Sequence, residues 1–197
     1  MEWGVASRPL AGHPASGDVG VVLPFPGGVL VATVDGLGHG DEAAAAARAA
    51  VGVLSGQPEA PVIWLMQRCH EALLETRGAV MSLASISARY GTLEWIGVGN
   101  VEGVLLRAGA AANPPRESLL LRGGVVGFNL PQLAAAVIPV ARGDTLVFAT
   151  DGVRSDFADR LTLGEPPPRL ADQLLAQHAK ETDDALVTVA VFLGATG

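Results

Sequence analysis

The sequence predicts an α+β fold in which mainly antiparallel sheets are flanked by helices. Apolar and β-branched runs separated by short turns occupy most of the chain, a pattern typical of hairpins. Helical patterns gather in separate segments and do not alternate regularly with strands, so an all-parallel sheet is not indicated. The apolar stripes of the helices need a surface to cover, and two stacked sheets would provide one.

The first part of the chain predicts three strands and then a helix. Apolar and β-branched residues indicate strands at Glu2 to Ser7, Val19 to Leu23 and Val29 to Val34. A short proline–glycine turn links the second strand to the third, which favours an antiparallel hairpin. Alanine-rich sequence predicts a helix from Asp41 to about Leu54, and the Ser-Gly-Gln-Pro segment that follows would end it.

A second helix is expected from Ala60–Pro61 to Thr76–Arg77, with Gly78 beyond its end. Its apolar residues recur at helical spacing and form one stripe: Val62, Leu65, Met66, Cys69 and Leu73. Cys69 is the single cysteine, so it cannot form an internal disulfide, and we interpret it as a small buried hydrophobic residue. His70, beside the stripe, is interpreted as a surface or hydrogen-bonded histidine.

The second part of the chain is predicted to be mostly strand. Alternating or continuous apolar runs indicate strands at Ser82–Arg89, Leu93–Val98, Val101–Arg107, Ser118–Leu121, Ala134–Val140, Thr145–Ala149 and Ala185–Leu193. The segment Gly123 to Gln132 is glycine-rich and irregular, and Arg154 to Pro168 is expected to be a loop. One further helix is expected from Arg169 to Lys180. Because no repeat or linker divides the chain, we expect a single domain over residues 1–197.

Composition limits the classes of partner and compartment. The net charge of −7 over 197 residues argues against nucleic acid as a partner. No apolar run reaches the roughly 18 residues that a membrane span requires, so no membrane association is expected. The start of the chain lacks the basic and apolar regions of a signal peptide, and we expect a cytoplasmic protein.

Acidic residues stand at one end of several predicted strands, each beside a glycine or another acid: Asp18, Asp35, Asp151 and the pair Asp183–Asp184. The predicted hairpin puts Asp18 and Asp35 at the same end, where they repel each other unless a cation or a proton lies between them. A single aspartate in such a place usually only favours a turn. Several that converge favour a hard cation with oxygen ligands, such as Mg²⁺ or Mn²⁺.

Other chemistries find less support in the sequence. No phosphate-binding P-loop string occurs, and the two Gly-x-Gly turns have Asp41 and Glu102 where a dinucleotide-binding turn needs its third glycine. One cysteine and four histidines supply a zinc site poorly. No serine has a histidine placed by a known hydrolase signature.

Four segments, taken in order, resemble the motifs of the metal-dependent PPM-type (type 2C) protein phosphatases: Ser16-Gly17-Asp18, Val34-Asp35-Gly36-Leu37-Gly38-His39-Gly40, Ala149-Thr150-Asp151-Gly152-Val153 and Asp183-Asp184-Ala185-Leu186. The resemblance covers nearly the whole chain. It is strongest to the SpoIIE-like branch and, within it, to RsbX-like stressosome phosphatases. It implies an α-β-β-α sandwich and a centre with two Mn²⁺ or Mg²⁺ ions that hydrolyses phosphoserine or phosphothreonine in proteins.

The resemblance also implies roles for individual residues. Asp35 would bridge both metals, and the Gly36 carbonyl would bind one of them. The remaining implied ligands are Asp18, Asp151 and Asp183. Asp184 could be a further ligand or could instead have a supporting role. His39 lies near, but not in register with, the histidine that eukaryotic relatives use as general acid, so we expect it to position the turn, with proton transfer as the alternative. The chain departs from the family at Ala185, where threonine or serine is common.

The implied reaction is in-line attack by a metal-activated hydroxide with no phosphoenzyme intermediate. The implied partners are phosphorylated STAS-domain proteins of a stressosome. Two alternatives remain open at this point. The substrate could be an anti-anti-sigma factor outside any stressosome, or the chain could be a catalytically inactive module that binds a phosphoprotein.

Overall fold

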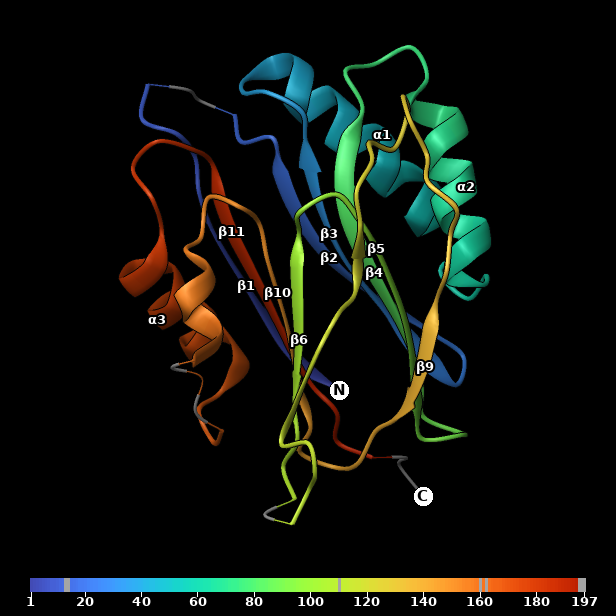
Figure 1. The fold of residues 1–197 in the computed structure, drawn as a ribbon, viewed down its shortest axis with the longest axis vertical. Coiled ribbons are helices and arrows are strands. Elements are labelled where there is room, and N and C mark those ends of the chain that lie inside the picture. Colours follow the sequence, from blue (N-terminus) through green and yellow to red (C-terminus); the bar gives the residue numbers. More distant parts are fainter. Residues whose placement is uncertain (13–14, 110, 160, 162, 195–197) are drawn as a thin grey trace.

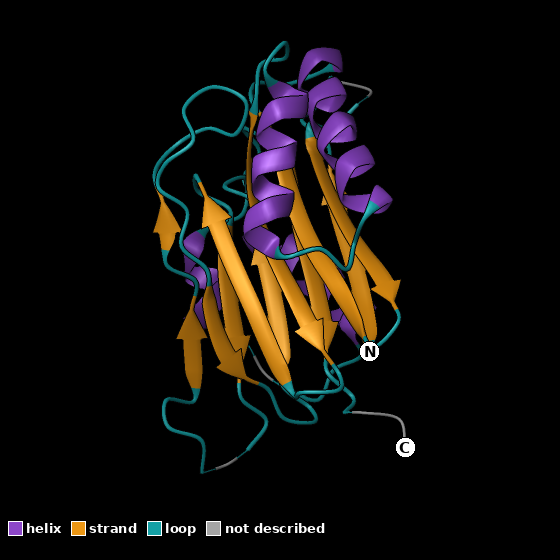
Figure 2. Ribbon diagram, turned by 90° about the vertical axis from the view of Figure 1, so that its right-hand side faces the viewer, coloured by secondary structure: helices purple, strands orange, loops and turns teal. Residues whose placement is uncertain are grey.

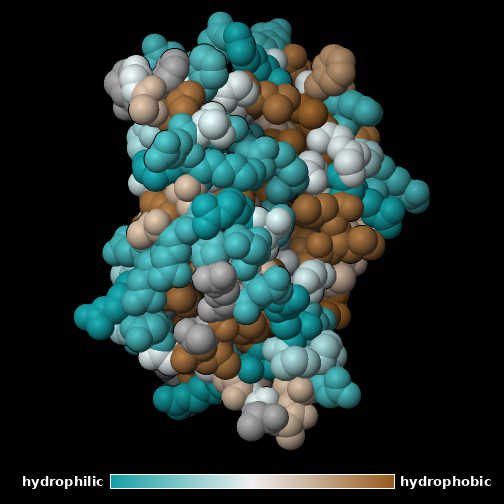
Figure 3. Space-filling model, turned by 60° about the vertical axis from the view of Figure 1, so that its left-hand side comes forward, coloured by the Kyte–Doolittle hydropathy of each residue, from teal (hydrophilic) through white to brown (hydrophobic). Residues whose placement is uncertain are grey.

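Two sheets pack face to face and carry helices on their outer faces, as the computed structural model shows (Figures 1 and 2). The structure describes residues 1–12, 15–109, 111–159, 161 and 163–194. Helices α1 (Asp41–Gly56) and α2 (Val62–Leu73) lie on one side, and α3 (Pro167–His178) lies on the other. The predicted α+β fold, an α-β-β-α sandwich, is confirmed. Figure 3 views the side on which α3 lies, where hydrophilic residues alternate with smaller hydrophobic patches.

Among the described residues, one sheet has five strands, and its pairings are antiparallel. Their spatial order is β1 (Glu2–Arg8), β11 (Ala185–Val191), β10 (Thr145–Ala149), β6 (Glu102–Leu106) and β7 (Arg116–Ser118). The chain's last strand, β11, therefore lies between its first strand and β10. Helix α3 packs on β1 and β11.

The other sheet lies under α1 and α2 and has six strands in the part of the chain that the structure describes. Its main order is β2 (Asp18–Phe25), β3 (Gly28–Gly36), β4 (Ala79–Ser87), β5 (Thr92–Val98) and β8 (Leu121–Arg122), and β9 (Ala136–Pro139) also pairs with β5. The predicted β2–β3 hairpin is confirmed, and its register places Asp18 opposite Asp35.

Three expectations about local structure were wrong in detail. The single strand predicted at Ser118–Leu121 is two strands in different sheets, because the chain crosses from β7 to β8 at Leu119 and Leu120. Helix α2 ends at Leu73, since Thr76 turns back to donate both its N–H and its hydroxyl to the Leu73 carbonyl. The predicted loop before α3 contains a short 3₁₀ helix at Ser155–Asp159.

Strand periodicity divides the interior into three apolar layers. Leu30, Ala32 and Val34 of β3 face α1 and α2, whereas Val29 and Val31 face the other sheet. A third layer lies between the five-stranded sheet and α3. Thr33 faces the other sheet, as Val29 and Val31 do, and by the same alternation Asp35 also faces it. The carboxylate of Asp35 therefore belongs to the space between the sheets.

The two side chains of interest on α2 behave as predicted. Cys69 is fully buried in the layer between the helices and the sheet, and burial raises the pKa of its thiol to about 12. His70 accepts a hydrogen bond at Nδ1 from the Gly127 N–H, at 2.9 Å. Neither residue is a free reactive group. In the described residues, no helix is both long and apolar enough to span a membrane.

A buried hydroxyl pair joins the two sheets and provides a test of their packing. Thr33 Oγ1 of β3 and Thr188 Oγ1 of β11 are 2.9 Å apart, and both residues are fully buried. We expect Thr33→Val to cost about 1–3 kcal/mol, because it leaves the Thr188 hydroxyl buried without its partner. The double variant with Thr188→Val should recover much of that loss. Urea unfolding of wild type, the two single variants Thr33→Val and Thr188→Val, and the double variant checks this. Strictly additive losses in the free energy of unfolding would contradict it.

Candidate metal centre

The strand-end acids meet at one end of the sandwich, the upper end in Figure 1. There Asp18 begins β2, Asp35 is the second-to-last residue of β3, and Thr150–Asp151 follow β10. A cavity of about 300 Å³ opens between them. Its lining residues are Leu10, Asp35, Leu37, Gly38, His39, Val80, Asn100, Asp151, Thr182 and Asp183. The structure thus brings Asp35, His39, Asp151 and Asp183 to one cavity, with Asp18 paired to Asp35 behind it.

The glycine turn after β3 fixes the floor of this site. A Cβ on Gly36 would lie 2.1 Å from the Ala43 carbonyl oxygen, so the end of β3 can touch the first turn of α1 only without a side chain. The Gly36 N–H donates to the Gly17 carbonyl, and the Leu37 N–H donates to the Gly78 carbonyl, both at 3.0 Å. Main-chain hydrogen bonds to the residues just before β2 and β4, the strands on either side of β3, therefore hold the segment around Asp35 in place.

Asp18 and Asp35 are held where negative charge is unfavourable. Burial is the main cause that raises the pKa of Asp18 to about 7, against a hydrogen bond of 2.7 Å from the Thr150 hydroxyl that lowers it. Burial also raises the pKa of Asp35 to about 8, and the charges of Asp18, Asp151 and Asp183 add to the rise. A cation among these carboxylates would remove the penalty.

These shifts predict how the metal-free protein responds to pH. Both folded-state pKa values lie above the ordinary value of 3.8, so the folded chain binds more protons than the unfolded chain between about pH 4 and pH 8. Its stability must then fall as the pH rises through that window. We expect a higher Tm at pH 5 than at pH 8 in the presence of a chelator. A net effect of about 2 kcal/mol corresponds to a change of roughly 4–8 °C in a chain of this size.

Thermal unfolding across that pH range, with and without Mn²⁺, measures the effect. Added Mn²⁺ should raise Tm most at the alkaline end, where the carboxylates are ionised. A metal-free Tm that is flat or rises from pH 5 to pH 8 would contradict the assignment of these shifts.

Asp151 and Asp183 form the opposite, more open wall of the cavity. The side chain of Asp151 is exposed and accepts a hydrogen bond of 2.7 Å from Asn100 Nδ2. Its main-chain carbonyl accepts a bond of 2.6 Å from Lys180 Nζ. Asp183 Oδ1 accepts the N–H of Asp184 at 2.9 Å. Sequence reasoning did not assign a role to Asn100 or Thr150, although Asn100 ends a glycine turn and Thr150 directly precedes Asp151.

Asp184 has a different place from its neighbour. It is 3% exposed and does not line the cavity. Its two carboxylate oxygens accept the N–H groups of Leu10 and Gly17, each at 2.7 Å. These bonds tie the loop before β2 to the start of β11. The geometry favours the supporting role for Asp184 over the ligand role, because both of its oxygens already hold main-chain donors.

The donor set suits a hard divalent cation that retains water. Within the described ranges, no three His, Cys, Asp or Glu side chains lie close enough to hold one ion by themselves. Mg²⁺ and related ions commonly keep several waters and need only one or two carboxylates each. Buried, mutually repelling carboxylates next to an open, water-accessible cavity meet that requirement.

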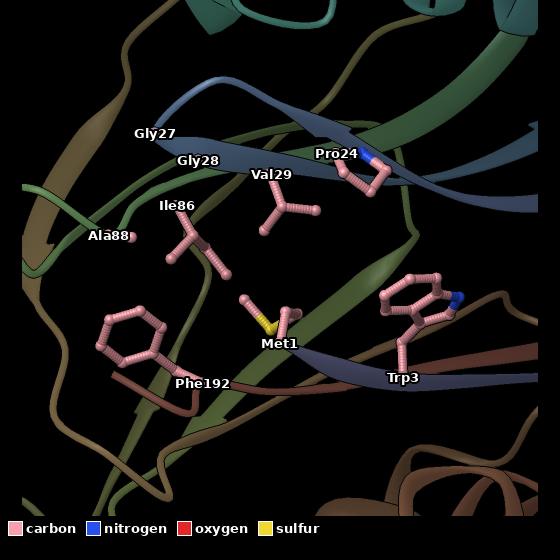
Figure 4. Close-up of a pocket in the computed structure, with 9 residues that line it drawn as sticks. All are labelled: Met1, Trp3, Pro24, Gly27, Gly28, Val29, Ile86, Ala88 and Phe192. Carbon is pink, nitrogen blue, oxygen red and sulfur yellow. The ribbon is translucent and has the colours of Figure 1, made fainter. Parts of the chain in front are cut away.

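A second cavity has a similar volume, about 320 Å³, so the acid-lined cavity is distinguished by its lining residues and not by its size. It lies toward the opposite end of β3, where apolar side chains from both sheets converge (Figure 4). Its lining residues are Met1, Trp3, Pro24, Gly27, Gly28, Val29, Ile86, Ala88 and Phe192. None of these side chains is ionisable, so among the described residues this cavity offers no carboxylate for a hard cation.

Comparisons with known proteins agree with this fold. The family model described as Stage II sporulation protein E (SpoIIE) matches residues 26–192. A comparison with curated proteins gave no match. One solved structure is 28% identical to this chain, with a TM-score of 0.85. It comes from work that describes the bacterial stressosome as a modular system adapted to control secondary messenger signalling. That likeness covers 95% of this chain and 97% of the other.

Two further solved structures share the fold at lower identity. RsbX in complex with magnesium is 21% identical with a TM-score of 0.82, and the likeness covers 94% of this chain and 92% of RsbX. The SiaA-PP2C domain of Pseudomonas aeruginosa is 19% identical with a TM-score of 0.79, over 96% of this chain and 85% of that domain. Since the family model spans most of the sequence, the chain belongs to the SpoIIE family, within the PPM-type protein phosphatases.

Proposed function

We propose that this chain is a single-domain, metal-dependent serine/threonine phosphatase that acts on phosphorylated STAS-domain proteins of a stressosome in the cytoplasm. The observation that carries the proposal is the convergence of Asp35, Asp151 and Asp183 on one cavity, with the buried Asp18 paired to Asp35. The likeness to a structure from stressosome work and to RsbX supports the choice of substrate.

Two Mn²⁺ or Mg²⁺ ions would be held by Asp18, Asp35, the Gly36 carbonyl, Asp151 and Asp183. When bound, such ions lower the pKa of water and neutralise charge on a phosphoryl group. Asp35 lies near the end of β3 and lines the cavity, so its carboxylate would supply oxygen ligands to these ions.

The cavity residues favour direct hydrolysis. Among the described lining residues there is no serine or cysteine to act as a nucleophile, and Cys69 is buried elsewhere. Water would attack phosphorus in line, a new P–O bond would form as the bond to the serine or threonine oxygen breaks, and inorganic phosphate would result. We infer that His39, which is exposed and lines the cavity, would give a proton to the leaving oxygen.

The test measures phosphate release by the purified chain from a phosphorylated STAS-domain protein and from an unrelated phosphoserine peptide, with Mn²⁺ or a chelator. We expect metal-dependent release from both and faster release from the STAS-domain protein. Equal rates on the two substrates would remove the stressosome assignment and favour another substrate, such as an anti-anti-sigma factor. Binding of the phosphoprotein without any release would identify an inactive binding module.

A further inference from the structure

The turn between β5 and β6 reaches the rim of the metal cavity. Gly99 in this turn has φ +96°, and a Cβ on it would lie 2.2 Å from Val80 Cγ1, so the chain passes directly over a residue of the cavity wall. The Gly99 N–H donates to the Arg122 carbonyl at 2.8 Å. The turn is thereby fixed, and it holds the next residue, Asn100, at the cavity.

Asn100 makes the contact that restrains the Asp151 side chain. Its Nδ2 donates to Asp151 Oδ2 at 2.7 Å, across 51 positions of sequence. The Asp151 main chain is held separately, because Lys180 Nζ donates to the Asp151 carbonyl and the Lys180 N–H donates to the Gly152 carbonyl at 2.7 Å. An exposed carboxylate would otherwise sample several rotamers, so the amide of Asn100 selects one of them.

The chemistry of an amide suits this task. An uncharged N–H donor can restrain one carboxylate oxygen and leave the other for a cation, whereas a lysine or arginine there would compete with the cation for the same charge. The nearby cation, Lys180, contacts the carbonyl of Asp151.

We propose that Asn100 is a positioning residue that orients the Asp151 carboxylate for metal binding; this rests on the proposed metal-dependent function. Removal of an outer-shell partner of this kind typically weakens metal affinity by about 10–100-fold. The effect should lie in metal affinity and not in the chemical step, because Asn100 acts through Asp151.

The experiment compares wild type with Asn100→Leu, which keeps the branched shape and the number of side-chain heavy atoms but removes the donor, and with Asn100→Gln, which keeps the amide. Asn129→Leu is the matched control, since Asn129 is an exposed loop residue that does not line the cavity. Mn²⁺ affinity is measured by calorimetry and by the electron paramagnetic resonance signal of free Mn²⁺, and Tm is measured in chelator.

We expect Asn100→Leu to bind Mn²⁺ about 10–100-fold more weakly, with Asn100→Gln in between and the control equal to wild type. Saturating Mn²⁺ should restore kcat to within about threefold, and metal-free Tm should be unchanged. Wild-type Mn²⁺ affinity in Asn100→Leu, or an equal loss of affinity in Asn129→Leu, would overturn the positioning role. The proposed function would still stand in that case if the wild-type enzyme shows Mn²⁺-dependent phosphatase activity. If wild type itself binds no Mn²⁺, both proposals fall.

Discussion

Replacing Asp35 with asparagine is expected to lower Mn²⁺-dependent phosphatase activity by about 10³-fold or more while the fold is retained. Asp35 lies just before the glycine turn at the end of β3, and burial, together with the charges of Asp18, Asp151 and Asp183, raises its pKa to about 8. Its carboxylate therefore lies where a cation would be most favourable. Metal ions supply several kcal/mol of transition-state stabilisation, and each 1.36 kcal/mol is a tenfold change in rate.

The same substitution should stabilise the metal-free protein at pH 8, because a neutral amide replaces a carboxylate that burial and its neighbours disfavour. Steady-state hydrolysis of an aryl phosphate measures the activity, and thermal unfolding in chelator measures the stability. Asp172→Asn, at an exposed position of α3, is the matched control and should behave as wild type. Equal rates for Asp35→Asn and wild type would exclude Asp35 from the chemistry.

Gly152→Ala is expected to have the largest effect on stability. A Cβ on Gly152 would lie 1.8 Å from the Asp184 carbonyl oxygen and 3.0 Å from the Ala185 Cα, and these main-chain atoms cannot rotate aside. The strain should cost about 3 kcal/mol or more, at the upper end for overpacking. Since Gly152 is where the Asp151 segment meets the Asp183–Asp184 segment, the cavity wall that Asp151 and Asp183 form should be distorted, and Mn²⁺ binding should weaken as well.

Gly52→Ala provides the opposite result as a control. Gly52 lies in α1 with open space around its Cα, so alanine there should stabilise the protein by about 0.5–1 kcal/mol. Chemical denaturation and Mn²⁺ titration of both variants check the pair. Wild-type stability in Gly152→Ala would show that the loops do not pack as described.

The sequence predicted the part of the site that depends on local pattern. Strand alternation and a short turn fix the β2–β3 register, so the facing of Asp18 and Asp35 followed from the hairpin alone. The apolar run before Asp151 likewise placed that acid at a strand end. The wider set of metal ligands came from the resemblance to PPM-type phosphatases and stays a prediction.

Features that depend on distant contacts could not be predicted in the same way. Asp183 and Asp184 are neighbours in sequence, but only Asp183 lines the cavity, and the donors that hold Asp184 come from Leu10 and Gly17. The bond from Asn100 to Asp151 joins two turns in different parts of the chain. The division of Ser118–Leu121 between two sheets also escapes local pattern, because both sheets accept the same alternation.

The central claim is that the strand-end acids form a divalent cation site. Anomalous diffraction from a crystal grown with Mn²⁺ tests it most directly. We predict Mn²⁺ peaks within the cavity, bonded to Asp35 and the Gly36 carbonyl and reaching Asp151 or Asp183 on the opposite wall. A cavity without an anomalous peak at saturating Mn²⁺, or peaks only at surface carboxylates elsewhere, would contradict the account.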